Sequence, residues 1–448
     1  MFQVVQDVKG GKVKMMDVPV PACGDNEILV KVRASLISAG TEKMVMDFAE
    51  KSLLGKAQAR PDLVQKVLQK MRKDGVAETV ASVFARLDEP MPLGYSMAGE
   101  VVAVGTKLSA EFKIGDRVAG AGAGLANHAD YVALPRNLTV PIPSGVPYEE
   151  ACYATLGAIA LHGVRNAAVG IGDRVLVVGL GLVGQLATQL AVAAGADVAA
   201  LDMDVGRCDL AVQGGATAAC TPADLSPISS IHAGRGFDAV LLCAATESDA
   251  LMQQAADLAR DRARVILVGK VGTRFDYASY MKKELTVGVS RSYGAGRYDP
   301  AFEQVGLSYP VGYVPHTERD NLAEVLRLMA LGKVRPDVLT THTFNFKNAL
   351  EAYDMIKHKK AFLGIVLAYE ETEGETEVLG GAAEVNGAAT GVRVSRDEVG
   401  VGFLGVGSFA RTVLLPTLVK VAGAHVVRLV SKGGLSAAGA RDKFAKTA

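Results

Sequence analysis

The sequence has no excess of either charge and few cysteines. Lysine and arginine together number 48, as do aspartate and glutamate, so the formal net charge is zero. This balance gives no support to nucleic-acid binding, which favours a basic surface. No two cysteines form a Cys-x-x-Cys pair, so we expect neither a disulfide framework nor a structural zinc cluster. The five cysteines are Cys23, Cys152, Cys208, Cys220 and Cys243.

Long apolar runs are also missing. The first residues, Met1 to Asp7, lack the basic and apolar blocks of a secretion signal. The longest apolar region, residues 175–201, is interrupted by Gln185, Gln189 and Asp197. A buried strand, helix and strand explain it better than a membrane span. We therefore expect a cytoplasmic protein with no membrane and no nucleic-acid partner.

What the sequence does contain is a glycine turn that occurs twice. The first turn, residues 179–184, follows the apolar run 175–178 and precedes a helix-like run. The second, residues 405–410, follows the apolar run 401–404. A strand, a glycine turn and a helix in this order are typical of a dinucleotide-binding fold.

The first turn predicts a cofactor site. Gly179 permits the tight turn, Gly181 lets a pyrophosphate approach the backbone, and Gly184 lets the helix pack closely. Leu182 and Val183 begin the helix, whose free amides and dipole favour phosphates. The alternative is a glycine turn in an α/β sheet that holds no ligand.

A carboxylate follows the next predicted strand. Asp202 in this place would accept hydrogen bonds from the adenosine ribose and repel a 2′-phosphate, which favours NAD(H) over NADP(H). Arg207 lies nearby and would tolerate a phosphate. The alternative for Asp202 is to cap the helix that begins near Val205. The candidate cofactor site also includes Thr155, Cys243, Ala244, Val268 and Gly269.

The remaining patterns divide the chain into segments. Residues 1–150 are strand-rich, with a helical insertion at about 43–90, whereas 151–309 alternate strand and helix as a doubly wound parallel sheet does. Strands are predicted at 174–179, 198–202, 238–243 and 264–269, and helices at 321–331 and 348–358. The stretch 310–368 either returns to the first domain or closes the sheet. An acidic linker at 370–391 and an incomplete second dinucleotide-binding segment at 392–448 follow.

Residues 1 to about 368 resemble the medium-chain dehydrogenase/reductase superfamily. The resemblance rests on the motifs at 27–32, 99–105, 115–118, 179–184 and 237–240. It implies an α/β protein with a GroES-like catalytic domain, a Rossmann domain and an active cleft between them.

The sequence departs from the zinc-binding members of that superfamily at the ligand positions. Ser38 stands where they have a cysteine, and Gly94-Tyr95-Ser96 where they have Gly-His-Glu. Because a catalytic zinc needs three good ligands, we expect no zinc. A site built from Glu42, Cys152 and His162 is the alternative.

Without a metal, another group must polarise the substrate. The resemblance places Tyr95 at the cleft, where its hydroxyl could donate to a substrate oxygen while Ser38 and Thr41 orient it. These side chains could equally fill a vacated metal pocket. Arg291, Tyr293 and Arg297 are the candidate substrate contacts, because arginines with tyrosines suit a polyhydroxylated or anionic molecule.

The motifs at 291–299, 309–313 and 402–411 also resemble bi-domain oxidoreductases. These fuse a zinc-less medium-chain dehydrogenase to a sugar dehydrogenase of the Gfo/Idh/MocA type, whose catalytic lysine lies further along than this chain reaches. We therefore expect the second module to be catalytically incomplete. The resemblance implies a homo-oligomeric, NAD-dependent oxidoreductase of alcohols or carbonyls on a small, sugar-like molecule. A quinone or enone reductase and a non-catalytic dinucleotide-sensing module are the alternatives.

Overall fold

The computed structural model describes residues 1–51, 90–232, 234–358, 361–370 and 399–444. Between 52 and 89 it describes only residues 55, 58, 64, 65, 67 and 69. Helix α1 (Ala39–Glu50) is described in full, whereas most of the helical insertion expected at 43–90 lies outside the described residues. So does the linker expected at 370–391, apart from Glu370. No helix in the described ranges is both long and apolar enough to cross a membrane.

The first sheet gathers strands from both ends of the chain. It has seven strands in the order β15-β16-β3-β5-β6-β8, with β7 also paired to β3. Strand β16 lies antiparallel to β3, so the chain returns to this sheet after the second one is complete. The strands are β3 (Glu27–Ile37), β5 (Ser96–Val104), β6 (Arg117–Ala121), β7 (Tyr131–Pro135), β8 (Thr139–Pro141), β15 (Thr340–Asn345) and β16 (Gly364–Ala368).

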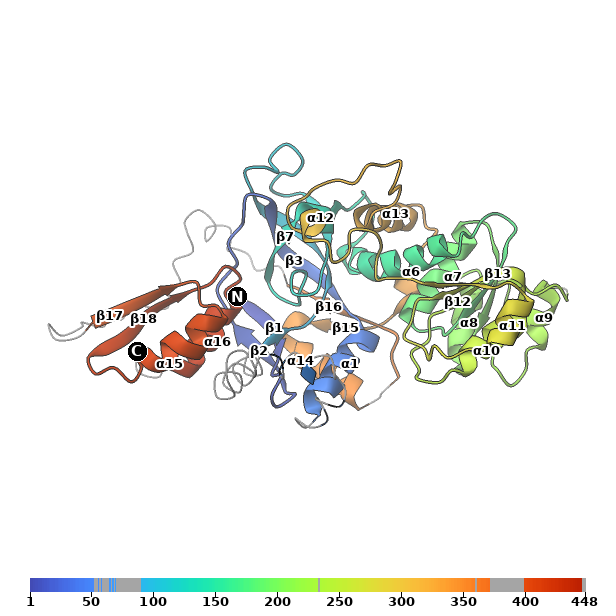
Figure 1. The fold of residues 1–448 in the computed structure, drawn as a ribbon. Helices are drawn as coiled ribbons and strands as arrows, with labels where there is room; N and C mark the ends of the chain where they lie inside the picture. The colour runs from blue at the N-terminus through green and yellow to red at the C-terminus, as the bar shows by residue number, and fades with distance from the viewer. Residues whose placement is uncertain are drawn as a thin grey trace.

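A small antiparallel sheet lies beside the first one. Its order is β2-β1-β4, and an amide hydrogen bond from Val4 to the carbonyl of His128 ties it to the loop before β7. Helix α14 (Ala349–Lys357) packs nearby, against α1 and β2 (Figure 1). The strands are β1 (Phe2–Gln6), β2 (Val13–Asp17) and β4 (Met91–Pro92).

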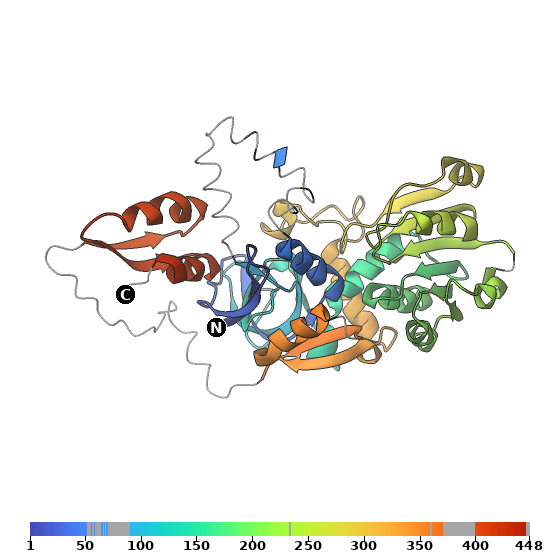
Figure 2. The same ribbon diagram turned by 90° about the horizontal axis from the view of Figure 1, so that it is seen from below.

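The second sheet consists of six parallel strands. Their order, β11-β10-β9-β12-β13-β14, places β9 and β12 side by side at the centre. The middle strands are apolar and buried on both faces because helices cover both sides (Figures 1 and 2). The strands are β9 (Arg174–Val178), β10 (Asp197–Leu201), β11 (Ala218–Cys220), β12 (Phe237–Leu242), β13 (Ala259–Leu267) and β14 (Thr286–Val289).

This strand order is that of a Rossmann fold, in which the order reverses between the first and fourth strands of the unit. The α/β fold class predicted from the sequence is confirmed. The helices of this part of the chain are α5 (Tyr148–Ala151), α6 (Ala154–Asn166), α7 (Leu182–Ala193), α8 (Val205–Gln213), α9 (Ser226–His232), α10 (Ala250–Leu258), α11 (Tyr277–Lys282), α12 (Pro300–Glu303) and α13 (Glu318–Ala330).

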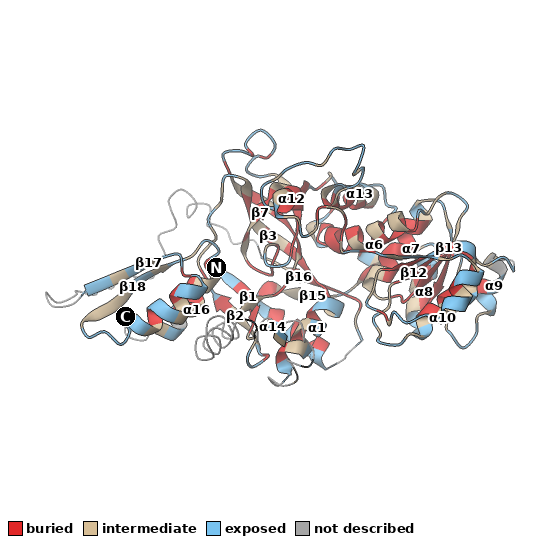
Figure 3. Ribbon diagram, in the orientation of Figure 1, coloured by how far each residue is buried: buried red, intermediate tan, exposed pale blue. Residues whose placement is uncertain are grey.

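One buried cluster runs through both large sheets. It includes Leu36 of β3 and Val366 of β16, Leu156 of α6, and Val175 of β9. Helix α6 is the element between the sheets, and it packs against both α7 and α13. Figure 3 shows buried residues continuing from the first sheet through α6 into the second. The two sheets are therefore joined by a shared apolar core.

The C-terminal residues form a separate small unit. Strands β17 (Val399–Leu404) and β18 (Ala424–Val430) pair in parallel. Between them a π-helical turn (Ala410–Leu414) continues into α15 (Leu415–Leu418), and α16 (Leu435–Phe444) follows β18. Ala438 of α16 packs against Val5, Met16 and Val18, so this unit rests on the small sheet (Figure 2).

Candidate functional site

The first glycine turn connects β9 to α7, and each glycine in it has its own surroundings. Gly179 has φ +89°, and a Cβ there would lie 2.5 Å from the amide nitrogen of Ala244. A Cβ on Gly184 would lie 1.9 Å from the carbonyl oxygen of Gly179. Around Gly181, in contrast, a Cβ would meet nothing within 4 Å. Two glycines therefore allow close packing, while the third borders open space.

That open space lies at the start of α7. Gly181 is the residue before the helix, and Leu182 and Val183 are its first two residues, all three partly exposed. The amides of a first helical turn have no partner within the helix. An anion at this place would meet free N–H groups and the positive end of the helix dipole. The cradle fits a dinucleotide pyrophosphate.

Asp202 follows β10 and is tied to the same turn. Its Oδ2 accepts a hydrogen bond from the amide of Leu180 at 2.6 Å, and its Oδ1 accepts one from the amide of Asp204 at 3.0 Å. The residue that caps α8 is Asp204, which accepts from the amide of Arg207. Asp202 is thus not the helix cap considered as an alternative, and its carboxylate lies beside the cradle.

Further predicted cofactor residues lie along the same edge of the sheet. The amide of Cys243 bonds the carbonyl of Val178, and the amides of Val268 and Gly269 both bond the carbonyl of Leu242. These contacts place the residues that follow β12 and β13 next to the glycine turn, together with Ala244. Burial raises the pKa of the Cys243 thiol to about 12, so this thiol is not a nucleophile at neutral pH.

Two other predicted residues are less free to bind a ligand. Thr155 is fully buried in α6, and its hydroxyl is 3.4 Å from the carbonyl oxygen of Gly120. Arg207 lies in the first turn of α8, where its carbonyl accepts a hydrogen bond from Gln185. The structure therefore brings Arg207 to the edge of the turn but places Thr155 inside the core.

The three predicted catalytic side chains meet in the first domain. The Tyr95 hydroxyl, just before β5, donates to Ser38 Oγ at 2.7 Å, and Thr41 also bonds it. Ser38 immediately precedes α1 and is nearly buried, whereas Thr41 is exposed in the first turn. Burial raises the pKa of Tyr95 above its usual value, against the two hydrogen bonds, and the nearby Glu42 raises it further. Tyr95 is therefore a neutral hydroxyl at physiological pH.

Side chains of the predicted substrate segment mostly contact other residues of the same region. Arg291 is exposed and lies over the ring of Tyr298, 5.7 Å from its centroid. The side chain of Tyr293 is buried, and the guanidinium of Arg297 forms an ion pair with Glu303 at 2.6 Å. Of the three predicted contacts, only Arg291 presents its side chain to solvent.

Comparison with known proteins gives two family matches on this chain. Residues 65–144 match the alcohol dehydrogenase GroES-like domain, and residues 183–305 match the zinc-binding dehydrogenase family. The first match includes strands β5 to β8 of the first sheet, and the second begins inside the glycine turn. The chain is therefore similar to alcohol dehydrogenases in its GroES-like part and to zinc-binding dehydrogenases in its second part.

Individual relatives cover both domains. Sorbitol dehydrogenase 1 of Saccharomyces cerevisiae is 27% identical over 308 residues, 60% of this chain and 78% of that protein. L-galactonate-5-dehydrogenase of Escherichia coli is 26% identical over 307 residues, 62% of this chain and 83% of that protein. The structure of an alcohol dehydrogenase from E. coli CFT073, complexed with NADH, has a TM-score of 0.61 and 19% identity, covering 82% of this chain and 99% of that one.

The name of the zinc-binding dehydrogenase family implies zinc, so the donor atoms around Tyr95 decide whether this chain fits the metal. The donors at the two expected ligand positions are the hydroxyls of Ser38 and Tyr95, which bond each other. Cys152 is buried, its pKa is raised by burial, and its Sγ bonds the carbonyl of Glu149. Among the described residues no three histidine, cysteine or carboxylate side chains gather for a metal. The donor set does not fit a zinc ion, which prefers thiolate, imidazole and carboxylate ligands.

Two acidic residues near the candidate site, Glu318 and Glu42, are buried, and their burial was not predicted from the sequence. Glu318 begins α13, is fully buried, and has no hydrogen-bond partner for either carboxylate oxygen. Burial, and then the charge of Glu303, raise the pKa of Glu318 to about 9 against the opposing effects of Arg297 and Arg291. Glu318 is therefore protonated at neutral pH. Only its place at the start of a helix could have drawn attention to it.

The second acid is Glu42, behind Tyr95. It is 3% exposed, and its partners Tyr353 and His128 come from distant parts of the sequence. From the sequence, Glu42 was expected only as an alternative metal ligand. No local sequence pattern connects residues so far apart, so the contacts of Glu42 with Tyr353 and His128 could not be predicted from the sequence.

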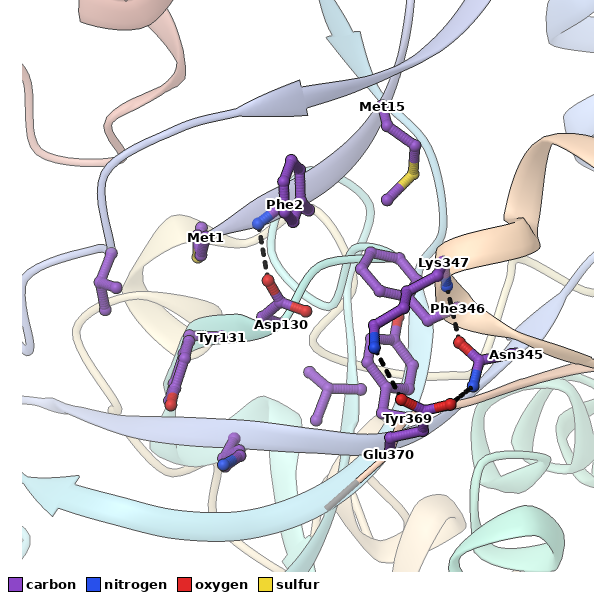
Figure 4. Close-up of a pocket in the computed structure, with 13 residues that line it drawn as sticks. Met1, Phe2, Met15, Asp130, Tyr131, Asn345, Phe346, Lys347, Tyr369 and Glu370 are labelled. Carbon is purple, nitrogen blue, oxygen red and sulfur yellow. Dashed lines mark hydrogen bonds and ion pairs between the residues drawn. The ribbon is translucent and has the colours of Figure 1, made fainter. Parts of the chain in front are cut away.

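A pocket of about 520 Å³ lies elsewhere in the first domain, between the small sheet and the ends of β7, β15 and β16 (Figure 4). Its polar groups are already paired. Asp130 accepts from the amide of Phe2, and Lys347 and Asn345 both bond Glu370. None of the predicted site residues lines this pocket, so it is separate from the candidate site.

Proposed function

We propose that this chain is an NAD-dependent, zinc-independent oxidoreductase that moves a hydride between nicotinamide and a secondary alcohol or carbonyl of a sugar or polyol. The cradle at Gly181 carries the proposal, because mostly backbone atoms crowd Gly179 and Gly184, while the space at Gly181 stays open where a pyrophosphate would approach. The relatives named above support an alcohol substrate of the polyol or sugar-acid kind.

The choice of NAD rests on Asp202. Its carboxylate lies at the end of β10 beside the cradle, where it would accept hydrogen bonds from the ribose hydroxyls of the adenosine. A 2′-phosphate would bring a second negative charge to the same place. Arg207, whose backbone is held in the first turn of α8, offers only one opposing charge.

When bound, NAD(H) accepts or supplies the hydride. The side chains of the protein itself position the reacting oxygen of the substrate. Tyr95 and Ser38 share one hydrogen bond, and rotation of their O–H bonds allows Ser38 to donate to Tyr95 while Tyr95 donates to the substrate oxygen. A neutral Tyr95 polarises a carbonyl in the reduction direction and orients the alcohol in the oxidation direction. The proton that the oxygen takes up or releases is exchanged with solvent, on the side where Thr41 is exposed. Arg291 is the exposed cation available to a polyhydroxylated or anionic substrate.

Binding and turnover separate this function from its alternatives. We expect nicotinamide fluorescence titration to show tighter binding of NADH than of NADPH. We also expect turnover with at least one member of a panel of polyols, sugars and sugar acids, in protein that contains less than stoichiometric zinc. One zinc per chain would contradict zinc independence. Tight NADH binding with no turnover on the panel would favour a sensing module, and reduction of quinones or enones would favour the reductase.

A further inference from the structure

Glu42 is a buried carboxylate with three donors aimed at it. Its Oε1 accepts from the backbone amide of Ser38 at 3.0 Å and lies 3.4 Å from Nε2 of His128. Its Oε2 accepts from the hydroxyl of Tyr353 at 2.5 Å. A carboxylate this deeply buried is tolerated only when it is well hydrogen-bonded. The three donors supply those bonds.

The donors come from three different elements. Ser38 precedes α1, His128 lies in the loop before β7, and Tyr353 is in α14. His128 is itself fixed, because its Nδ1 lies 2.7 Å from the hydroxyl of Ser35 and its amide bonds the carbonyl of Leu93. Glu42 therefore joins α1 to the loop before β7 and to α14.

Ser38 links this buried carboxylate to Tyr95. Its amide donates to Glu42, while its hydroxyl accepts from Tyr95 at 2.7 Å. Any change that moves the amide of Ser38 also moves the oxygen that holds Tyr95. The position of the Tyr95 hydroxyl therefore depends on the carboxylate of Glu42, which is too deeply buried to contact a substrate.

We propose that Glu42 is a positioning residue for the reaction, holding Ser38 and, through it, the Tyr95 hydroxyl in the orientation that meets the substrate oxygen. The negative charge of Glu42 also disfavours a phenolate at Tyr95, which keeps that hydroxyl a donor. This inference rests on the proposed function, because it assigns Tyr95 to the substrate.

The decisive variant is Glu42→Gln, which keeps the size of the side chain. It removes the charge and leaves one acceptor oxygen for the donors that two oxygens serve now. We expect kcat to fall about tenfold, with the affinity for NADH unchanged, because the cofactor cradle lies in the other domain. An equal loss of NADH affinity would contradict the proposal.

A double-mutant cycle tests whether Glu42 acts through Tyr95. If it does, Glu42→Gln lowers kcat in the native background but has almost no further effect in a Tyr95→Phe background. Equal losses in both backgrounds would show that Glu42 acts independently of Tyr95 and would overturn the proposal.

A matched control exists on the same helix. Glu50 is an exposed residue of α1 whose carboxylate pairs with Lys357 at 2.7 Å. Glu50→Gln makes the same chemical change outside the buried network, and we expect it to leave kcat and the affinity for NADH at their native values. A loss of kcat in this variant that matches the loss in Glu42→Gln would overturn the proposal.

A second measurement needs no turnover, so it distinguishes failure of this inference from failure of the proposed function. Carbon-13 at the hydroxyl-bearing ring carbon of tyrosine reports the hydrogen bond of each hydroxyl, and the signal of Tyr95 is the one lost in Tyr95→Phe. We expect that signal to move in Glu42→Gln and to stay in place in Glu50→Gln. A Tyr95 signal that stays in place in Glu42→Gln overturns the proposal even if the protein is an active dehydrogenase. Should Glu42→Gln fail to fold, Tyr353→Phe removes one of the three donors and must move the same signal.

Discussion

The two glycine turns start from one sequence pattern and end in different surroundings. Gly179 and Gly405 have nearly the same backbone conformation, with φ of +89° and +93°. A Cβ on Gly179 would strike Ala244, whereas a Cβ on Gly405 would meet nothing within 4 Å. The difference comes from strand β12, which lies beside β9 and ends just before Ala244. Among its described residues, the C-terminal unit has no strand that corresponds to β12. The pattern therefore specifies the turn, but adjacent strands give the first turn the packing of the candidate site.

The acid beside the turn differs in the same way. Leu180 donates its amide to Asp202, whereas Val406 donates its amide to a backbone carbonyl, that of Val430. After β18 the chain places Lys432, which forms an ion pair with Glu27 of the first domain. In the place of Asp202, directly after the strand, the second unit has Ser431, and its nearby cation Lys432 pairs with the first domain.

The largest expected effect tests the packing of the two turns. Gly179→Ala forces a Cβ against the backbone of Ala244 at a positive φ, and we expect it to destabilise the protein by about 3 kcal/mol or more. Gly405→Ala carries only the conformational penalty, about 1 kcal/mol. Thermal and denaturant unfolding of both variants measure the difference. Similar losses of stability in the two would break the comparison.

An intermediate effect tests the acid. Asp202→Ala should weaken NADH binding by about 1–3 kcal/mol, the range for hydrogen bonds to a charged group, and should narrow the preference over NADPH. Lys432→Ala, two residues after the end of β18, should leave the affinity for NADH unchanged. Fluorescence titration with both cofactors provides the measurement. Unchanged NADH affinity in Asp202→Ala would remove Asp202 from the cofactor site.

The last effect accumulates with pH and concerns Glu318, at the start of α13. Its pKa is raised from 4.5 to about 9, so between these values the folded state holds a proton that the unfolded state has lost. Stability from this group is complete below pH 4.5 and declines as pH rises toward 9, by about 1.4 kcal/mol per pH unit. Glu318→Gln should remove that decline, and unfolding at several pH values would show its stability advantage growing with pH. A constant difference between the two proteins would contradict the buried, protonated state.

Local sequence patterns were sufficient for most of the second sheet. The strand expected at 174–179 is β9 (Arg174–Val178), and the one expected at 198–202 is β10 (Asp197–Leu201). Strand β11 was not predicted, because Ala218–Cys220 is only three residues long and has no alternating pattern. Helix α13 begins at Glu318 instead of 321, because Thr317 and Asp320 form a capping box there.

The site was predictable where it depends on neighbours in sequence. The turn at 179–184 and Asp202 follow from strand ends in a parallel sheet, and Tyr95 with Ser38 from the resemblance to a family. The partners of Glu42 were not predictable, because Tyr353 is 311 positions away. The burial of Tyr293 and the Arg297–Glu303 pair likewise depend on tertiary packing. The substrate roles of Arg291, Tyr293 and Arg297 stay predictions.

The return of β15, β16 and α14 to the first sheet has a consequence for biosynthesis. All strands of the second sheet lie within residues 174–289, so that sheet is complete before the ribosome has made Thr340. The first sheet is begun earlier and finished later, with Tyr353 among the last side chains to reach its core. Since domains fold as they emerge, the part of the protein that is synthesised first is the part that matures last, and its apolar interior stays open in the meantime.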